Sequence, residues 1–148
     1  MNIGEKIALL TSKDQKQAYN ALKELIACSE HSDQGYQYFD CFVEMMRDAN
    51  SYVRTRGLRF IAYHSKWDKD KKVDQIIEEY LMHMEDEKPI TARQCIKDTP
   101  IIARYKPELM DQILMALDHC DKIYDDSMQH LIYQDRQQAI RQIRQYTW

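Results

Sequence analysis

One apolar pattern occurs three times in this chain at a constant spacing, and it limits the possible folds more than any other feature. Each copy has apolar residues at positions i, i+3 and i+7, which lie on one face of an α-helix. The copies are 37 residues apart and consist of Tyr36, Phe39 and Val43, then Val73, Ile76 and Tyr80, then Met110, Ile113 and Leu117. A period of this length that contains two helices is typical of a helical solenoid. An irregular helical bundle with chance periodicity is the alternative.

Short polar breaks divide the chain into seven or eight predicted helices. Apolar residues recur every three or four positions almost throughout, and Ser12, Ser32 and Asn50 stand at breaks where a helix can start. Pro89 and Pro107 each open a segment, at the first-turn position where proline costs least. The predicted helices span residues 3–10, 13–30, 33–48, 51–65, 71–85, 89–105, 107–118 and 127–145.

The composition agrees with an all-α domain. The 148 residues include only three Gly and three Pro, too few for the turns of a many-stranded β fold. No flexible linker divides the chain, so we expect one domain over residues 1–148, a right-handed α-α superhelix of about four helix pairs. Ala21, Gly57 and Cys95 are small residues of alternate helices, where neighbouring helices would approach closely. The expected pairs are 3–30, 33–65, 71–105 and 107–145.

Residues 48–58, with the sequence DANSYVRTRGL, resemble a HEAT repeat. In that family an Asp at the turn between two helices is followed five and six residues later by Val-Arg, here Asp48, Val53 and Arg54. The resemblance implies HEAT/ARM-like helix pairs in which the helix that begins with Val-Arg is the inner, concave one. It also implies a ladder of Asp and Arg side chains between successive repeats, which this chain would not complete because Ala92 replaces the next Arg.

Over its whole length the chain also resembles short stand-alone bacterial HEAT-like proteins, some of which are named SufBD after an iron–sulfur assembly scaffold. This resemblance implies no activity and no functional residue. It adds a role as an iron–sulfur assembly accessory to the functions to be considered, and that role would require cluster or iron binding through thiols.

Charge is distributed unevenly between alternate helices, although the net charge of the chain is only −3. The net charges are +4, +3, +2 and 0 for the expected inner segments 51–66, 89–106, 127–145 and 13–30. They are −3, −4 and −3 for the expected outer segments 33–48, 71–87 and 107–118. The superhelix would therefore have a basic concave face and an acidic back.

The basic face is the candidate binding site. On a helical wheel, one stripe of residues 51–65 is apolar, and the opposite, exposed stripe is basic and aromatic. With the basic positions of the next two inner helices, the candidate site comprises Tyr52, Arg56, Arg59, Tyr63, Lys66, Arg93, Lys97, Arg104 and Arg141. Such a face suits carboxylates or phosphates, and we expect it to bind an acidic protein or peptide.

Two alternatives to this site remain open. The arginines could instead pair with acids of the neighbouring outer helices and only keep the surface solvated. The face could also hold the phosphate backbone of a nucleic acid, as some HEAT-like proteins do, including a class of DNA glycosylases. The net negative charge, the short chain and the lack of an identifiable catalytic Asp with flanking aromatic residues make nucleic acid the less favoured partner.

The sequence offers no catalytic or cofactor-binding motif. Its three glycines are at positions 4, 35 and 57, which excludes a glycine-rich phosphate loop. None of its five histidines precedes a Glu, which excludes the His-Glu pairs of some HEAT-like dinuclear iron enzymes. The nearest approach to a metal cluster has ligands that point in different directions at a helix end, namely His119, Cys120 and Asp121 with Asp125 and Asp126. We therefore predict a protein that is not an enzyme and has no metal and no cofactor.

The N-terminal stretch and the cysteines predict where the protein is located. The first residues include a Glu in place of a basic region and an apolar run of only four residues, which does not fit a signal peptide. Nothing in the sequence approaches a membrane span. Cys28, Cys41, Cys95 and Cys120 are widely spaced and indicate reduced, mostly buried thiols. We expect a cytoplasmic protein with no membrane partner, in which Trp148 covers the last helix pair.

Overall fold

The computed structural model describes residues 2–125 and 127–146 of the chain. Within these ranges it contains eight α-helices, five short 3-10 helices and no strand, which confirms the all-α prediction. The α-helices are α1 (Ile3–Ala8), α2 (Gln15–Ser29), α3 (Phe39–Met46), α4 (Ser51–His64), α5 (Lys72–Met82), α6 (Pro89–Tyr105), α7 (Met110–Asp118) and α8 (Gln129–Arg144). The 3-10 helices are η1 (Leu9–Thr11), η2 (Gln34–Tyr38), η3 (Ser65–Trp67), η4 (His83–Glu85) and η5 (Pro107–Leu109). The covering role expected for Trp148 lies outside the described residues.

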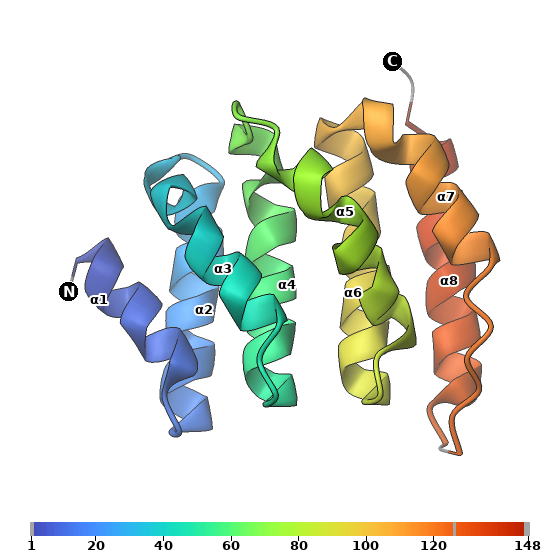
Figure 1. Ribbon diagram of the computed structural model, residues 1–148, viewed down its shortest axis with the longest axis horizontal. Helices are drawn as coiled ribbons and strands as arrows, with labels where there is room; N and C mark the ends of the chain where they lie inside the picture. The colour runs from blue at the N-terminus through green and yellow to red at the C-terminus, as the bar shows by residue number, and fades with distance from the viewer. Residues whose placement is uncertain (1, 126, 147–148) are drawn as a thin grey trace.

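The helices follow one another in chain order along the long axis of the molecule (Figure 1). The even-numbered helices α2, α4, α6 and α8 lie side by side in one layer, in which α4 packs against α2 and α6, and α6 against α8. The odd-numbered helices α1, α3, α5 and α7 cross in front of this layer. Three of them, α1, α3 and α7, pack directly on the even-numbered helix that follows in the chain.

Side chains at the polar breaks start several of these helices. The side-chain oxygen of Asn50 accepts two backbone N–H groups from the first turn of α4, at 2.9 and 3.4 Å. The carboxylate of Asp14 caps α2 in the same way, at 3.1 Å from the backbone nitrogen of Gln17. The predicted helix 89–105 is α6, whereas the predicted helices 33–48 and 107–118 begin as η2 and η5. Tighter 3-10 turns are frequent at helix ends, and the apolar spacing does not distinguish them from α-helix.

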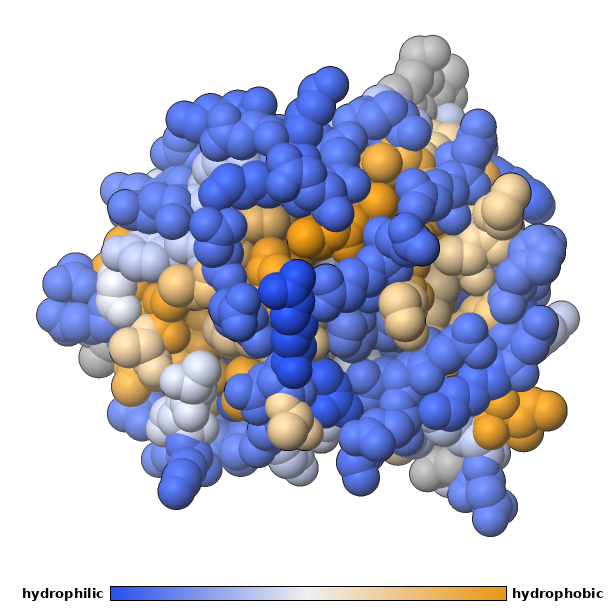
Figure 2. All heavy atoms as spheres, viewed as in Figure 1, coloured by the Kyte–Doolittle hydropathy of each residue, from blue (hydrophilic) through white to orange (hydrophobic). Residues whose placement is uncertain are grey.

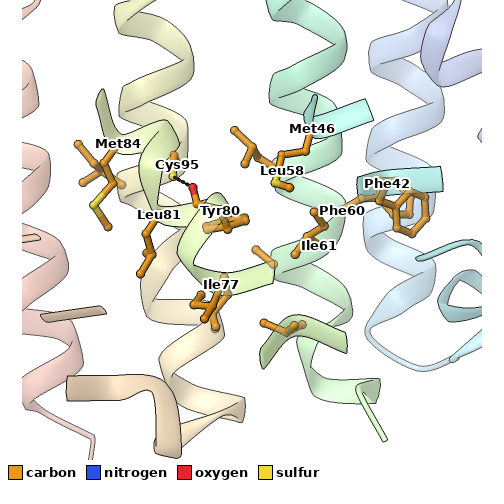
Figure 3. Packing of buried hydrophobic residues seen from close by; sticks show 14 of the residues in the cluster. Phe42, Met46, Leu58, Phe60, Ile61, Ile77, Tyr80, Leu81, Met84 and Cys95 are labelled. Atoms are coloured by element: carbon orange, nitrogen blue, oxygen red, sulfur yellow. Dashed lines mark hydrogen bonds between the residues drawn. The ribbon is translucent and has the colours of Figure 1, made fainter. Parts of the chain in front are cut away.

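The hydrophobic core lies between the two layers. Seven of the nine residues of the repeated apolar pattern are buried, and the other two, Ile76 and Met110, are half-buried and pack against the core. The pattern therefore marks core positions, as predicted. Figure 3 shows the central part of this core, to which α3, α4, α5, η4 and α6 contribute Phe42, Met46, Leu58, Phe60, Ile61, Ile77, Tyr80, Leu81, Met84 and Cys95.

Gly57 allows α4 to lie directly against α3. A Cβ atom on Gly57 would come within 2.7 Å of the backbone nitrogen of Met46 and 2.8 Å of the backbone oxygen of Phe42. Both are backbone atoms of α3, which cannot move without shifting the whole helix. The close approach predicted at this small residue is confirmed, and Ala21 and Cys95 are also buried.

Helix α6 continues through Pro100, which has no backbone N–H to donate. The carbonyl oxygen of Ile96, four residues earlier, accepts a hydrogen bond from the hydroxyl of Thr99 at 2.8 Å instead. The carbonyl oxygen of Pro100 itself accepts a hydrogen bond from the hydroxyl of Tyr146, at 3.1 Å. A side chain of the same helix thus satisfies the carbonyl that the proline leaves free.

A buried ion pair joins α4 to the turn that precedes α6. The guanidinium of Arg54 contacts both carboxylate oxygens of Asp86, at 3.0 and 2.8 Å, and also donates to the carbonyl oxygens of Asp48 and Ala49. The side chains of Arg54 and Asp86 are both almost fully buried. The resemblance to HEAT repeats implies an Arg–Asp pair of this kind, as one rung of a ladder between successive helix pairs.

Candidate functional site

Eight of the nine predicted site residues lie on the even-numbered helices, and Lys66 lies on η3, which extends α4; the nine differ widely in exposure. Four are exposed, four are half-buried and one is buried. The exposed residues are Tyr52, Lys97, Arg104 and Arg141, the half-buried ones are Arg59, Tyr63, Lys66 and Arg93, and the buried one is Arg56. Exposure therefore divides the predicted face into residues that a partner can reach and residues that support the fold.

The exposed position predicted for Arg56 is wrong. Its side chain points toward the first helix pair and is only 6% exposed. Its Nε atom donates to the carbonyl oxygen of Leu10 at 2.7 Å, and its Nη1 atom donates to the side chain of Gln15 at 3.0 Å. Burial lowers the pKa of the Arg56 guanidinium. A helical wheel with one buried side cannot predict this environment, because α4 packs against α3, α2 and α6.

Arg59 and Arg93 are neutralised by acids of the next even-numbered helix. The Nε atom of Arg59 lies 3.6 Å from Oδ2 of Asp98 on α6, and the Nε atom of Arg93 lies 2.7 Å from Oδ2 of Asp135 on α8. These two arginines are therefore paired internally, but the acids belong to the same layer, so the outer-helix partners that the alternative hypothesis expected are wrong for them. Burial raises the pKa of Asp98 to about 6 even beside Arg59.

Lys106 belongs to the basic segment 89–106 but does not contribute to its surface. Its side chain is buried, with the Nζ atom 3.2 Å from Oδ2 of Asp68 and 2.6 Å from Oδ1 of Asp74. The carboxylate of Asp68 also accepts the backbone N–H groups of Lys72 and Val73, which start α5. Lys106 is therefore part of the junction between α5 and α6.

Four cations of the predicted face remain available to a partner. Within residues 2–125 and 127–146, none of Lys66, Lys97, Arg104 and Arg141 takes part in an ion pair. All four are on the layer of even-numbered helices or on the 3-10 turn that extends α4. The exposed charge of this layer is therefore basic even after Arg59 and Arg93 have been neutralised.

Two of these cations meet in a pocket at the C-terminal ends of the even-numbered helices. The pocket has a volume of about 410 Å³. It is lined by Ser29, Glu30, Tyr63, Lys66, Ile101, Arg104, Tyr105, Gln142 and Tyr146. The structure thus brings Tyr63, Lys66 and Arg104 of the predicted site together, whereas Tyr52, Lys97 and Arg141 do not line this pocket. We call it the basic tyrosine pocket.

Tyr105 lines the basic tyrosine pocket and lies close to both of its cations. Its ring centroid lies 5.8 Å from the Nζ atom of Lys66 and 5.4 Å from the guanidinium carbon of Arg104. Lys66 also donates a hydrogen bond of 2.6 Å to the carbonyl oxygen of Glu30, just beyond the end of α2. The partial negative charge at helix C-termini attracts such cations and helps to hold them in place.

The helical pattern did not reveal Tyr105, Gln142 and Tyr146. Tyr105 is 40% exposed and lies one turn after Ile101 on the same face of α6, a spacing that could have identified it. Tyr146 follows the end of α8, where no periodicity extends. Its hydroxyl reaches Pro100 on α6, and only the packing of α8 on α6 brings it to the pocket.

The cysteines are divided equally between core and surface, so the expectation of mostly buried thiols is wrong for two of them. Cys95 and Cys120 are buried, and burial raises the pKa of both thiols, while Cys28 and Cys41 are exposed. Among the described residues, which leave out Asp126, no group of three or more His, Cys, Asp or Glu side chains is placed to hold a metal ion.

Comparison with known proteins returns no family model, no curated protein and no solved structure that matches this chain. The resemblance to HEAT repeats therefore rests on residues 48–58 and on the repeated apolar pattern, and it stays a prediction. Over the part of the chain that the structure describes, no helix combines the length and the apolar character needed to cross a bilayer.

Proposed function

We propose that this chain is a non-catalytic binding module that holds an acidic segment of another protein in the basic tyrosine pocket. In this proposal the helix pairs form a short, right-handed, HEAT-like superhelix, and the even-numbered helices are its concave side. The chain-order stacking of the pairs in Figure 1 and the buried Arg54–Asp86 pair, which fits one rung of the Arg–Asp ladder, support that architecture. Such folds present an extended surface and curvature without a deep catalytic cleft.

The observation that carries the proposal is the convergence of Lys66 and Arg104 around Tyr105 in the basic tyrosine pocket. Both side chains lack an ion-pair partner among the described residues, so each can bind a carboxylate without breaking an existing ion pair. A guanidinium presents two parallel donors to a carboxylate, and an ammonium adds a point charge. The tyrosine rings supply a surface for the aliphatic part of Glu side chains.

The rest of the face favours an acidic segment over a single anion. Lys97 and Arg141 lie on α6 and α8 outside the pocket, and both are exposed. Together with the pocket they would create a positive field along the layer of even-numbered helices. A peptide with several acidic residues would therefore associate faster and bind more tightly than an isolated carboxylate.

The proposal is tested by fluorescence anisotropy with a short Glu- and Asp-rich peptide at about 50 mM and about 150 mM salt. The wild-type protein is expected to bind and to weaken as salt rises. The double substitution Lys66→Ala/Arg104→Ala should weaken binding about tenfold or more, because it removes both unpaired cations of the pocket. Lys13→Ala/Lys88→Ala removes the same charge from exposed positions elsewhere and should retain most of the affinity.

The same titration with single- and double-stranded nucleic acid separates the two classes of partner. One outcome would identify a nucleic acid, bound through its phosphate backbone, as the partner in place of an acidic protein. In that outcome nucleic acid binds with a steep salt dependence, Lys66→Ala/Arg104→Ala abolishes this binding, and the acidic peptide binds weakly or not at all. Equal peptide affinity for both double variants would refute the pocket as the binding site. Circular dichroism and thermal melts show whether each variant keeps its fold.

A further inference from the structure

A second pocket, of about 410 Å³, lies on the layer of odd-numbered helices, between α5 with its extension η4 and α7. Its lining residues are Glu78, Leu81, Met82, Met84, Glu85, Gln112, Met115, Ala116, His119 and Cys120. Figure 2 shows this face, on which apolar side chains gather between α5 and α7 among hydrophilic ones. We call it the methionine groove.

The floor of the methionine groove is buried and its edges are exposed. Leu81, Met84 and Cys120 belong to the hydrophobic core and form the floor. Met82 and Met115, on opposite sides of the groove, are 71% and 66% exposed. Large apolar side chains that stand free beside a continuous apolar floor mark an interaction site, because their exposure to water is unfavourable.

The charge around the methionine groove is acidic. Glu78 and Glu85 line it and are exposed, and neither forms an ion pair within residues 2–125 and 127–146. Asp111 and Asp118 of α7 are also exposed and without an ion pair in those ranges. Unpaired carboxylates on both sides favour a partner with positive charges beside its apolar anchors.

The dimensions and chemistry of the groove suit an α-helix. The eleven residues of α5 extend over about 16 Å, the length of about three helical turns. Apolar anchors at i, i+3 or i+4 and i+7 of a docked helix would span this length on one face. Unbranched methionine side chains adapt to anchors of different shape, as they do in other helix-binding grooves.

We propose that the methionine groove docks an amphipathic helix of a partner protein that has apolar anchors on one face and Lys or Arg on the flanks. This site is separate from the basic tyrosine pocket and prefers the opposite charge. The two sites lie on opposite layers of the fold, so one chain can hold an acidic segment and a basic helix at the same time.

A labelled amphipathic peptide of about eighteen residues, long enough to form a helix, with Leu and Phe anchors and Lys flanks, is the probe. Fluorescence anisotropy is expected to show saturable binding to the wild type and at least tenfold weaker binding to Met82→Gln/Met115→Gln. Both methionines are exposed, so the fold should persist. Ile90→Gln/Tyr133→Gln removes two comparably exposed apolar side chains from even-numbered helices and should leave the affinity unchanged.

A charge exchange makes the test specific. The same peptide with Glu in place of each Lys should bind the wild type at least tenfold more weakly, and Glu78→Lys/Glu85→Lys should reverse that preference. Equal binding of the two peptides to the wild type, or unchanged binding to Met82→Gln/Met115→Gln, overturns the proposal. So does self-association of the wild type in sedimentation velocity that Met82→Gln/Met115→Gln abolishes, because the groove would then hold a second copy of the chain.

Discussion

Gly57 sets how closely α4 approaches α3. Gly57→Ala would place a Cβ atom against backbone atoms of Phe42 and Met46, so one helix would have to shift. We expect the free energy of unfolding to fall by about 1–3 kcal/mol or more, as measured by urea denaturation. Gly4→Ala is the matched control, because the nearest atom to its Cβ is the side-chain hydroxyl of Tyr38, at 3.1 Å. Equal stability of Gly57→Ala and wild type would contradict the packing of α3 on α4.

His64 makes the stability of the fold depend on pH. Its ring is buried and is stacked on the ring of Phe60, with the two ring centroids 4.8 Å apart. The centroid of the Phe42 ring is 5.4 Å away. Burial lowers the pKa of His64, although the carbonyl oxygen of Phe60 interacts with its Nδ1 atom. The unfolded chain therefore takes up a proton on this ring more readily than the folded chain does.

The contribution of the neutral His64 ring is complete above the unfolded pKa of about 6.5 and is lost as the pH falls below that value. Between about pH 6.5 and the lower pKa of the folded state, protonation of His64 should lower the free energy of unfolding of the wild type by up to about 1.4 kcal/mol per pH unit. His64→Asn keeps a side-chain donor for the Phe60 carbonyl but does not titrate. Urea denaturation from pH 7.5 to pH 5, with steps of about 0.5 unit, should show a shallower pH slope for the variant. Parallel slopes would contradict this role for His64.

At the scale of single residues, sequence patterns predict the packing of helices better than they predict polar contacts. The close approach at Gly57 follows from a small residue on an apolar stripe, whereas the burial of Arg56 depends on Leu10 and Gln15, more than 40 positions earlier. Periodicity records which side of a helix is apolar. It does not record that the flank of α4 meets the end of η1 and the start of α2.

Arg54 and Asp86 connect two consecutive helix pairs at the scale of elements. Arg54→Met would leave the Asp86 carboxylate buried without its cation, which typically costs about 3–5 kcal/mol. Urea denaturation should show this loss, and Asp86→Ala should show a similar one, because it also removes the bond to the backbone N–H of Lys88 at the start of α6. The double variant should lose less than the sum of the two.

An exposed ion pair between the same two pairs of helices is the control. The Nε atom of Arg47 lies 2.8 Å from Oε2 of Glu79 on α5, but 47% and 36% of the two side chains are exposed to water. Arg47→Met should therefore leave the unfolding midpoint almost unchanged. If Arg54→Met has as small an effect, the rung does not connect the pairs energetically.

The positions of the helices follow from the sequence to within a few residues, because breaks at Asn50, Pro89 and Pro107 combine a local signal with a change of apolar phase. Whether the first or last turn of a helix is α or 3-10 does not follow from the sequence. Residues 34–38 form a 3-10 helix, and a side chain at Gly35 within it would collide with the ring of His64 on α4. That constraint comes from a helix that lies elsewhere in the sequence.

At the scale of the whole molecule, the two layers differ in charge. The even-numbered layer exposes Lys66, Lys97, Arg104 and Arg141, while the odd-numbered layer has the methionine groove with its unpaired carboxylates. A count of charges by helix predicts this separation. It cannot predict that Asp98 and Asp135 neutralise two arginines of the basic layer, because both pairs form between neighbouring helices.

The central claim is that an acidic segment binds in the basic tyrosine pocket, and an NMR titration of the isotope-labelled protein with the Glu- and Asp-rich peptide tests it most directly. The account predicts saturable shifts of the signals of Tyr63, Lys66, Arg104 and Tyr105, and little change along α5 and α7. Those shifts should disappear in Lys66→Ala/Arg104→Ala at the same peptide concentration. Shifts confined to the odd-numbered helices, or none at low salt, would contradict the account.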